Sequence, residues 1–356
     1  MGAAALVVSL ALVGCAGDEK GASEPSSGTV AVEPERGEIA TRFGAGDRLF
    51  ARDGAGRRLR GPLSDRLLGT LAPLLVPEPA GGPLVAYQSW RDDGPSLRLH
   101  DLRDGRDRVL ADRALSIAWR AGTIAYVRVV EGEGEVPERS FGHVVVRSGL
   151  RGPEARWTTS PGSYVVAAWA GRRLLAYRLR EGWPDLLVLD GPGRARVLAR
   201  ASALVAVSPD GGRAFLAEYG ASPPLVRVVD VPSGDEVARA SLPDLRWVSE
   251  SGSWASDRVA ATTSEGIAVL EVREGTVELE QTLRFPPEEF QLAGLEPRLD
   301  EAAEKVTARA SLVPRPQQAV GSAVLVECDR ATLRCTRSAR FPESPGPRVV
   351  YNPSRP

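Results

Sequence analysis

The sequence predicts an all-β fold made of four-stranded antiparallel sheets that repeat along the chain, and three observations support this prediction. Short runs of β-branched and apolar residues are separated by Gly, Pro, Ser and Asp, which is the pattern of strands and tight turns. Residues 204–242 contain four such runs in succession, so one sheet is complete within this stretch. A small residue inside an apolar run also recurs at a similar interval through most of the chain.

The recurring small residue sets the length of the repeat. It occurs at Ala51, Ala86, Ala125, Ala176, Ala217, Ala261 and Ala308, each of which we place in the second strand of a sheet. The mean spacing is about 43 residues, which is the period of β-propeller blades with four strands each. Residues 38–356 therefore predict a β-propeller, with seven blades as the first expectation and six or eight as alternatives.

Turn residues recur in register with this repeat. An acidic residue ends the third strand and Gly follows a few positions later, as in Asp101 and Gly105, Asp190 and Gly193, Asp230 and Gly234, and Glu271 and Gly275. A second set of turns follows the first strand, with Trp119 before Gly122, Trp169 before Gly171, and Pro209 before Gly211. Gly suits these positions because it accepts a positive φ.

One copy of the repeat carries a family resemblance. Residues 208–213 read Ser-Pro-Asp-Gly-Gly-Arg before an apolar strand, and they resemble the WD-repeat-like segment of TolB-type β-propellers. The resemblance covers most of residues 38–356 at the level of architecture. Residues 348–354 match a first strand and its turn, whereas residues 48–51 match a second strand. We therefore expect the two termini to share one blade, which closes the ring and removes exposed sheet edges.

The first residues predict export. Residues 3–14 form an apolar run that is too short to span a bilayer but fits the core of a secretory signal. Residues 12–15, Leu-Val-Gly-Cys, resemble a bacterial lipobox, which implies that residues 1–14 are a lipoprotein signal peptide and that Cys15 is lipidated. The alternative is a plain signal peptide followed by an incidental Cys. The resemblance places the protein on the outer face of the cytoplasmic membrane, held there by its lipid only.

Residues 15–37 are rich in Gly, Ser, Glu, Pro and Ala, so we expect a lipidated Cys15 and a flexible tether before the propeller domain of residues 38–356. The formal net charge is −1 and no long run of like charge occurs, so the basic footprint of a nucleic-acid partner is missing. We expect a monomeric ring whose partner is a protein or a cell-envelope ligand.

The sequence offers little material for catalysis. His100 and His143 are the only histidines, and both occupy ordinary strand positions, whereas metal and catalytic sites need two or three convergent ligands. Nucleophile-elbow, phosphate-loop and dinucleotide-binding motifs are absent from the sequence. We expect no cofactor, no metal and no catalysis. The alternative is an envelope hydrolase or lyase whose carboxylates meet on the propeller face from separate blades.

Cys328 and Cys335 predict a disulfide. They flank the turn between a third strand and an outer strand, with the same spacing as Val231 and Ala238 in the 204–242 sheet. Cross-strand neighbours lie close enough for a disulfide, and an exported protein meets an oxidising environment. The alternative is two reduced cysteines in the core.

The predicted loops separate into two faces of the ring. Connections from strand two to strand three and from blade to blade share one side, which we call the long-loop face, and the other turns share the tight-turn face. The long connections are residues 88–96, 128–142, 178–184, 218–224 and 309–322. They carry the candidate ligand-binding residues Trp90, Arg91, Phe141, Trp183, Tyr219 and Arg315, because aromatic and Arg side chains suit recognition. The alternative is that these side chains fold back over the blade edges.

These patterns predict a non-catalytic binding or scaffold protein at the bacterial cell envelope. A related alternative is a structural subunit whose ring docks against a membrane complex.

Overall fold

The structure is a computed structural model that describes residues 26–32, 39–42, 48–51, 76–77, 84–91, 94–101, 106–130, 141–263, 265–286, 290–291, 297–312, 322–337 and 341–342. The regular elements of these residues are all strands. Within these ranges, no helix has the length and apolar character needed to cross a membrane.

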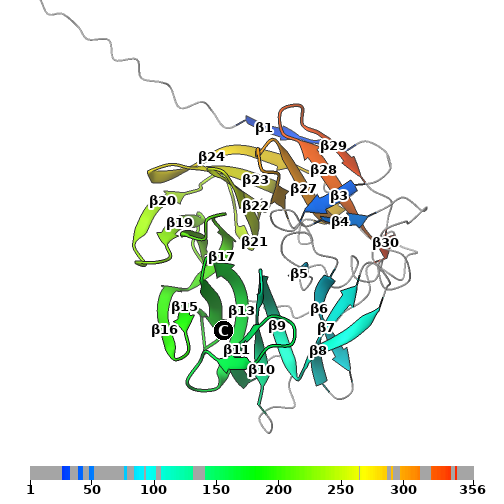
Figure 1. Cartoon of the computed structure of the whole chain (residues 1–356). Coiled ribbons are helices and arrows are strands. Elements are labelled where there is room, and N and C mark those ends of the chain that lie inside the picture. Colours follow the sequence, from blue (N-terminus) through cyan, green and yellow to red (C-terminus); the bar gives the residue numbers. More distant parts are fainter. Residues whose placement is uncertain are drawn as a thin grey trace, which may run out of the picture.

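Successive four-stranded antiparallel sheets follow one another around a ring (Figure 1). The first two sheets in chain order are β5 (Val76–Pro77), β6 (Leu84–Arg91), β7 (Gly94–Asp101) and β8 (Asp107–Asp112), and then β9 (Ala114–Arg120), β10 (Thr123–Val129), β11 (Phe141–Ser148) and β12 (Glu154–Arg156). The next two are β13 (Gly162–Ala170), β14 (Arg173–Arg178), β15 (Asp185–Gly191) and β16 (Arg194–Arg200), and then β17 (Ser202–Val207), β18 (Arg213–Glu218), β19 (Leu225–Asp230) and β20 (Glu236–Ser241). The fifth is β21 (Val248–Ala255), β22 (Arg258–Thr263), β23 (Gly266–Val272) and β24 (Gly275–Arg284).

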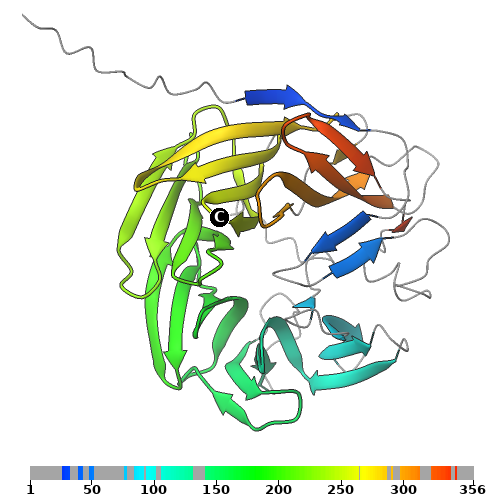
Figure 2. The same ribbon diagram turned by 45° about the horizontal axis from the view of Figure 1, so that its top comes forward.

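Most of the remaining strands lie between the β21–β24 blade and the β5–β8 blade (Figure 2). The last sheet contains β25 (Phe290–Gln291), β26 (Arg298–Leu299), β27 (Lys305–Leu312), β28 (Ser322–Asp329), β29 (Arg334–Arg337) and β30 (Phe341–Pro342). The antiparallel pair β3 (Ile39–Arg42) and β4 (Arg48–Ala51) lies between this sheet and the β5–β8 blade (Figure 2), with β3 against β27 and β28. The prediction of an all-β propeller is therefore confirmed. The blade number and the closure by residues 348–354 stay predictions, because residues 52–75 and 343–356 lie outside the described ranges.

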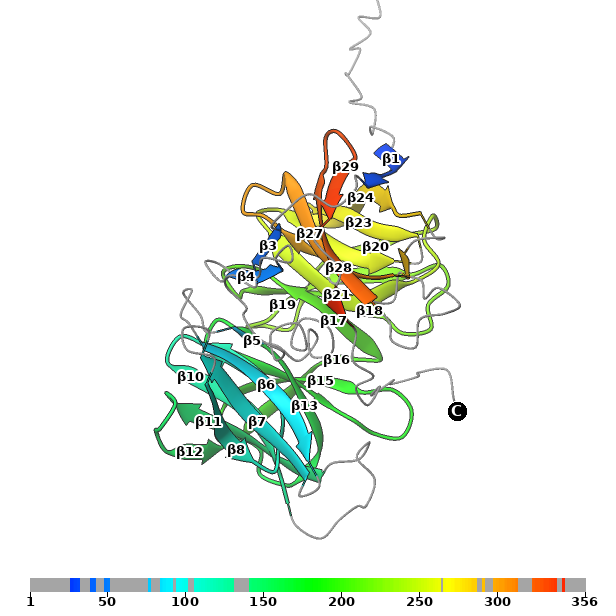
Figure 3. The ribbon, with the colours of Figure 1, turned by 90° about the vertical axis from the view of Figure 1, so that its right-hand side faces the viewer.

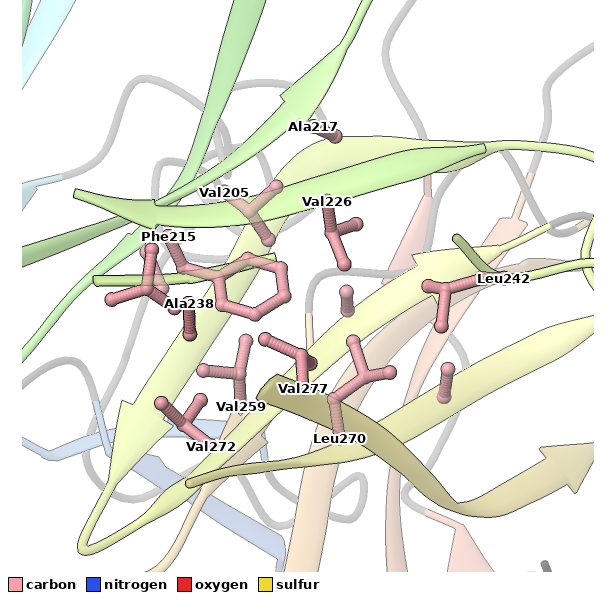
Figure 4. Packing of buried hydrophobic residues seen from close by; sticks show 14 of the residues in the cluster. Val205, Phe215, Ala217, Val226, Ala238, Leu242, Val259, Leu270, Val272 and Val277 are labelled. Atoms are coloured by element: carbon pink, nitrogen blue, oxygen red, sulfur yellow. The ribbon is translucent and has the colours of Figure 1, made fainter. Parts of the chain in front are cut away.

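The core lies between blades rather than within them. Ala86, Ala125, Ala176, Ala217, Ala261 and Ala308 are buried and lie in β6, β10, β14, β18, β22 and β27, the second strand of each described blade, as predicted. One apolar cluster joins Val205 and Phe215 of the β17–β20 blade to Val259 and Leu270 of the β21–β24 blade (Figure 4). Within the described residues, the other apolar clusters likewise combine side chains of two neighbouring blades, so these blades bury their faces against one another.

The inner strand of several blades contains a β-bulge. In β9, β13 and β17 the extra residues are Ser116, Ala167 and Val205, which are skipped by the partner strand. Such a residue leaves the ladder locally unpaired. A polar side chain of the preceding blade accepts a hydrogen bond from the N–H group at or beside each of these bulges.

The bonds run from blade to blade around the ring. Ser116 N donates to Gln88 Oε1 at 3.2 Å, and Ser116 Oγ accepts from Val166 N at 2.9 Å. Leu204 N donates to Tyr177 Oη in the same way. Leu299 N of β26 donates to Ser253 Oγ of β21 at 2.8 Å. Side chains therefore satisfy inner-strand amides across four of the blade interfaces in the described residues.

The predicted glycine turns within the described residues have the expected conformation, whereas Gly105 lies outside these residues. Gly122, Gly171 and Gly211, which follow first strands, have φ values of 67°, 57° and 72°. Gly193, Gly234 and Gly275, which precede outer strands, also have positive φ. The corresponding first turns of the β21–β24 blade and of the last sheet use Ser256 and Ala303, with φ of 53° and 56°. The sequence pattern missed these two turns because they lack Gly.

The N-terminal segment corrects one expectation. β1 (Ser26–Thr29) pairs in parallel with β24, and β2 (Ala31–Val32) pairs in parallel with β29, so both add to outer strands (Figure 3). Val30 lies between them in the apolar core, and its N donates to Arg284 O at 2.9 Å. Residues 26–32 were expected in the flexible tether of residues 15–37. They pack on the domain because the outer strands leave backbone groups available for pairing.

The predicted disulfide is confirmed. Cys328 of β28 and Cys335 of β29 are cross-strand partners, and a disulfide joins them with their Cα atoms 4.0 Å apart. Both residues are buried in the cluster that also contains Val30. The bond therefore fixes the outer strand on which β2 rests.

Replacing Gly211 with Ala is expected to lower the free energy of unfolding by about 3 kcal/mol. A Cβ atom at Gly211 would overlap the backbone of Gly171 in the preceding blade, and the positive φ adds strain. The matched variant is Gly122→Ala, where φ is also positive but nothing lies within 4 Å of the new Cβ, and its cost is expected to be about 1 kcal/mol. Urea unfolding measures both values. Equal losses would show that the close approach of the two turns does not limit stability.

Candidate functional site

Two of the predicted ligand-face residues meet on the long-loop face. Trp183 lies in the loop that follows β14, and Tyr219 directly follows β18 of the next blade. Their rings stack with centroids 4.9 Å apart and planes at 8°. Trp183 nevertheless remains 40% exposed, so the stack presents an aromatic surface to solvent.

Backbone hydrogen bonds connect the loops of this region. Ala201 N donates to Pro184 O at 3.2 Å, and Tyr219 N donates to Ala201 O at 2.8 Å. Leu242 N donates to Pro224 O at 2.9 Å, which joins the Tyr219 loop to the connection between β20 and β21. That connection carries Trp247, which is also 40% exposed. We call Trp183, Tyr219 and Trp247 the aromatic surface.

The large exposed apolar side chains of the described residues are concentrated on the long-loop face. Val130 follows β10, Val165 lies toward the start of the inner strand β13, and Trp183 and Trp247 belong to the aromatic surface. The other two, Val109 and Val197, lie on the outer strands β8 and β16. A set that shares one face of the ring is more informative than exposed apolar residues scattered over the whole surface, which are common on proteins.

A buried carboxylate lies beside the aromatic surface. Asp185 starts β15, two residues after Trp183, and its Oδ2 atom contacts Arg178 at 2.7 Å and Arg180 at 3.0 Å. Arg200 at the end of β16 lies 3.9 Å from Oδ1. Three guanidinium groups therefore surround one carboxylate at this edge of the β13–β16 blade.

Three of the other candidate residues lie in strands of other blades. Phe141 is the first residue of β11, where it pairs with Ser163. Trp90 and Arg91 belong to β6, because the β6–β7 ladder continues to Arg91 and Gly94. The expectation of a long loop over residues 88–96 is therefore wrong. Arg315 and Cys15 lie outside the described residues. Trp247 was missed, although its position in a blade-to-blade connection is a signal that pointed to it.

The histidines occupy strand positions. His100 is buried in β7, and His143 Nδ1 in β11 lies 3.3 Å from Thr158 O. Within the described residues, no group of three or more His, Cys, Asp or Glu side chains is placed to hold a metal ion.

A cluster of hydrogen-bonded titratable side chains lies at the interface of the β5–β8 and β9–β12 blades. Buried Tyr126 donates to Glu154 Oε1 at 2.5 Å, and Glu154 also pairs with Arg128 and Arg147. Arg147 in turn donates to Leu110 O of β8 at 2.8 Å. Burial, and then the hydrogen bond to Glu154, raises the pKa of Tyr126 to about 12. Burial alone would raise the pKa of Glu154, but hydrogen bonds from Tyr126 and the two arginines lower it below the usual range. The cluster binds two blades together.

Stability is expected to fall between about pH 10 and about pH 12 because of Tyr126. The unfolded tyrosine loses its proton near pH 10, whereas the folded one keeps it to about 12, so the folded state binds more protons in this window. The loss amounts to about 2 to 3 kcal/mol of unfolding free energy. Urea unfolding measured across this pH range should show that the free energy of unfolding falls less steeply with pH in Tyr126→Phe than in the wild-type chain. Identical slopes in the two proteins would contradict this assignment.

Similarity to known proteins is found among solved structures. No family model matches the chain, and no curated protein matches it. The chain is similar to the tricorn protease at a TM-score of 0.50 and 11% identity, over 81% of this chain and 32% of that one. It is similar to TolB from Acinetobacter baumannii at a TM-score of 0.46 and 14% identity, over 75% of this chain and 65% of that one.

A third similar structure is the Pyrococcus horikoshii acylaminoacyl peptidase, at a TM-score of 0.46 and 15% identity, over 80% of this chain and 46% of that one. The identity of 11% to the tricorn protease is too low to show more than a shared fold.

Proposed function

We propose that the protein is a lipid-anchored, extracytoplasmic β-propeller that binds a protein or cell-envelope ligand through its long-loop face, without catalysis. The observation that carries this proposal is the concentration of exposed large apolar side chains on that face. Exposed aromatic residues on a rigid scaffold are the usual anchors of an interface. The stack of Trp183 on Tyr219 also restricts both side chains before binding, which lowers the entropy that a partner must offset.

The tight-turn face uses its aromatic and arginine residues differently. Trp169 Nε1 donates to Ala118 O of the preceding blade at 3.1 Å, and Arg120 lies over the Trp169 ring at 4.6 Å. Arg196 donates to Val231 O and Pro232 O of the following blade. These side chains hold neighbouring blades together, so they are less available to a partner than Trp183 and Trp247.

Two features favour an envelope location. The lipobox resemblance at Cys15 implies export and a lipid, and the disulfide between Cys328 and Cys335 suits an oxidising compartment. Ser26, at the start of β1, pairs with Gln281 on the outer edge of the β21–β24 blade. An anchor that reached the domain through β1 would meet it at this edge, so it would leave the long-loop face uncovered.

The double variant Trp183→Ala with Trp247→Ala is expected to reduce partner capture at least about tenfold, because anchor residues of this kind contribute most of an interface's binding energy. Capture is measured by cross-linking the full-length protein in detergent-solubilised membranes and quantifying the adducts. The matched control is Val109→Ala with Val197→Ala, which removes comparably exposed apolar side chains from outer strands. If the tryptophan variant kept its fold and all its adducts, the binding face would be wrongly assigned.

Cys15→Ala is expected to abolish both incorporation of a labelled fatty acid and retention in the membrane fraction. Without a diacyl group the tether has no apolar attachment to the bilayer. Ser23→Ala, a change of similar size in the expected tether, serves as the control and should behave like the wild-type protein. A wild-type chain that took up no lipid would show that the protein is secreted rather than anchored.

A further inference from the structure

We infer that the aromatic surface binds an acidic segment of a partner protein, with Arg180 and Arg200 contacting carboxylates and the Trp183–Tyr219 stack contacting an apolar or planar side chain. This inference rests on the proposed function, since it names the partner chemistry of the same face.

Positive charge is in excess around Asp185. Asp185 is nearly buried, and its single carboxylate lies within 4 Å of Arg178, Arg180 and Arg200. Even when exposed Glu181 is counted, three guanidinium groups outnumber two carboxylates. An acidic ligand would balance this excess, whereas a basic one would add to it.

Two of the three arginines around Asp185 are accessible to a ligand. The Arg178 side chain is 33% exposed and donates to Asp185 Oδ2, so it mainly serves the fold. The Arg180 and Arg200 side chains are 52% and 80% exposed. At 3.9 Å, the contact of Arg200 with Asp185 is longer than a hydrogen bond. Its planar group therefore has donors that a carboxylate in solution can approach in a bidentate manner.

The accessible arginines also lie beside Trp183 in the fold. Trp183 and Asp185 flank Pro184, whose carbonyl accepts from the amide of Ala201, the residue after Arg200. Arg180, Arg200 and Trp183 therefore share one pair of adjacent chain segments, and Tyr219 adjoins them because its N donates to Ala201 O. In the neighbouring blade, Arg227 and Arg239 are paired with Glu218 and Glu236, so the charges there balance. The positive excess lies on the Trp183 side of the aromatic surface.

The test titrates the full-length protein in detergent into a fluorescein-labelled random copolymer of Glu and Tyr and follows anisotropy. Arg180→Gln with Arg200→Gln is expected to weaken binding about tenfold, the size expected from losing two exposed charge contacts. Trp183→Ala should weaken it comparably, and raising the salt concentration should weaken binding to the wild-type protein. The matched control, Arg172→Gln with Arg194→Gln, removes two exposed arginines from the tight-turn face and should leave binding unchanged.

A copolymer of Lys and Tyr and the neutral oligosaccharide maltoheptaose serve as competing probes. The inference is overturned if either binds better than the acidic copolymer, or if the Arg180 and Arg200 variant binds that copolymer as well as the wild type does. If the double variant does not fold, the single variant Arg200→Gln replaces it in the test, because the Arg200 side chain is 80% exposed.

The outcomes separate the inference from the proposed function. Suppose that the Trp183→Ala, Trp247→Ala variant loses its membrane adducts, whereas the Arg180→Gln, Arg200→Gln variant keeps its adducts and still binds the copolymer. The inferred partner chemistry is then wrong, and the assignment of the binding face stands. If the tryptophan variant keeps its adducts, the binding face itself is wrong.

Discussion

The ring depends on side chains that bind backbone amides of the next inner strand. Bulges at Ser116, Ala167 and Val205 interrupt the ladders of β9, β13 and β17, and a buried N–H group without an acceptor costs about 1 to 3 kcal/mol. Gln88, Ser116 and Tyr177, each from the preceding blade, supply the acceptors. Because Ser116 both donates its own amide proton and accepts the next one, three consecutive blades are connected through a single residue, and their inner strands depend on one another.

The two faces of the ring differ in how tightly neighbouring blades are joined. On the tight-turn face, the turns of neighbouring blades approach so closely that Gly211 leaves no room for a side chain beside Gly171. Trp169 and Arg196 are likewise bonded across blade boundaries. On the long-loop face, Trp183 and Trp247 stay exposed although backbone hydrogen bonds connect their loops to neighbouring segments. We therefore propose that recognition falls to the long-loop face, where a positive excess surrounds Asp185 beside the aromatic stack.

Local patterns predicted much of this arrangement and failed where a partner strand was decisive. Residues 88–96 contain polar and Gly residues that suggest a loop, yet the ladder with β7 extends β6 to Arg91. Residues 26–32 have the composition of a tether, but the outer edges of β24 and β29 offer them backbone partners. Neither outcome can be read from composition, because it depends on which strand edge happens to lie nearby.

The sequence by itself determined the all-β class, the repeat marked by alanines such as Ala176 and Ala217, the glycine turns, and the pairing of Cys328 with Cys335. These features follow from the short-range geometry of strands and turns, in which spacing along the chain sets the distance in space. The tertiary structure alone decided that Trp183 stacks on Tyr219, that Trp247 joins their face, and that three arginines surround Asp185. Several of these contacts cross blade boundaries or join strand ends. Such contacts depend on how the blades twist and pack against one another. The order of residues along one blade does not specify that packing.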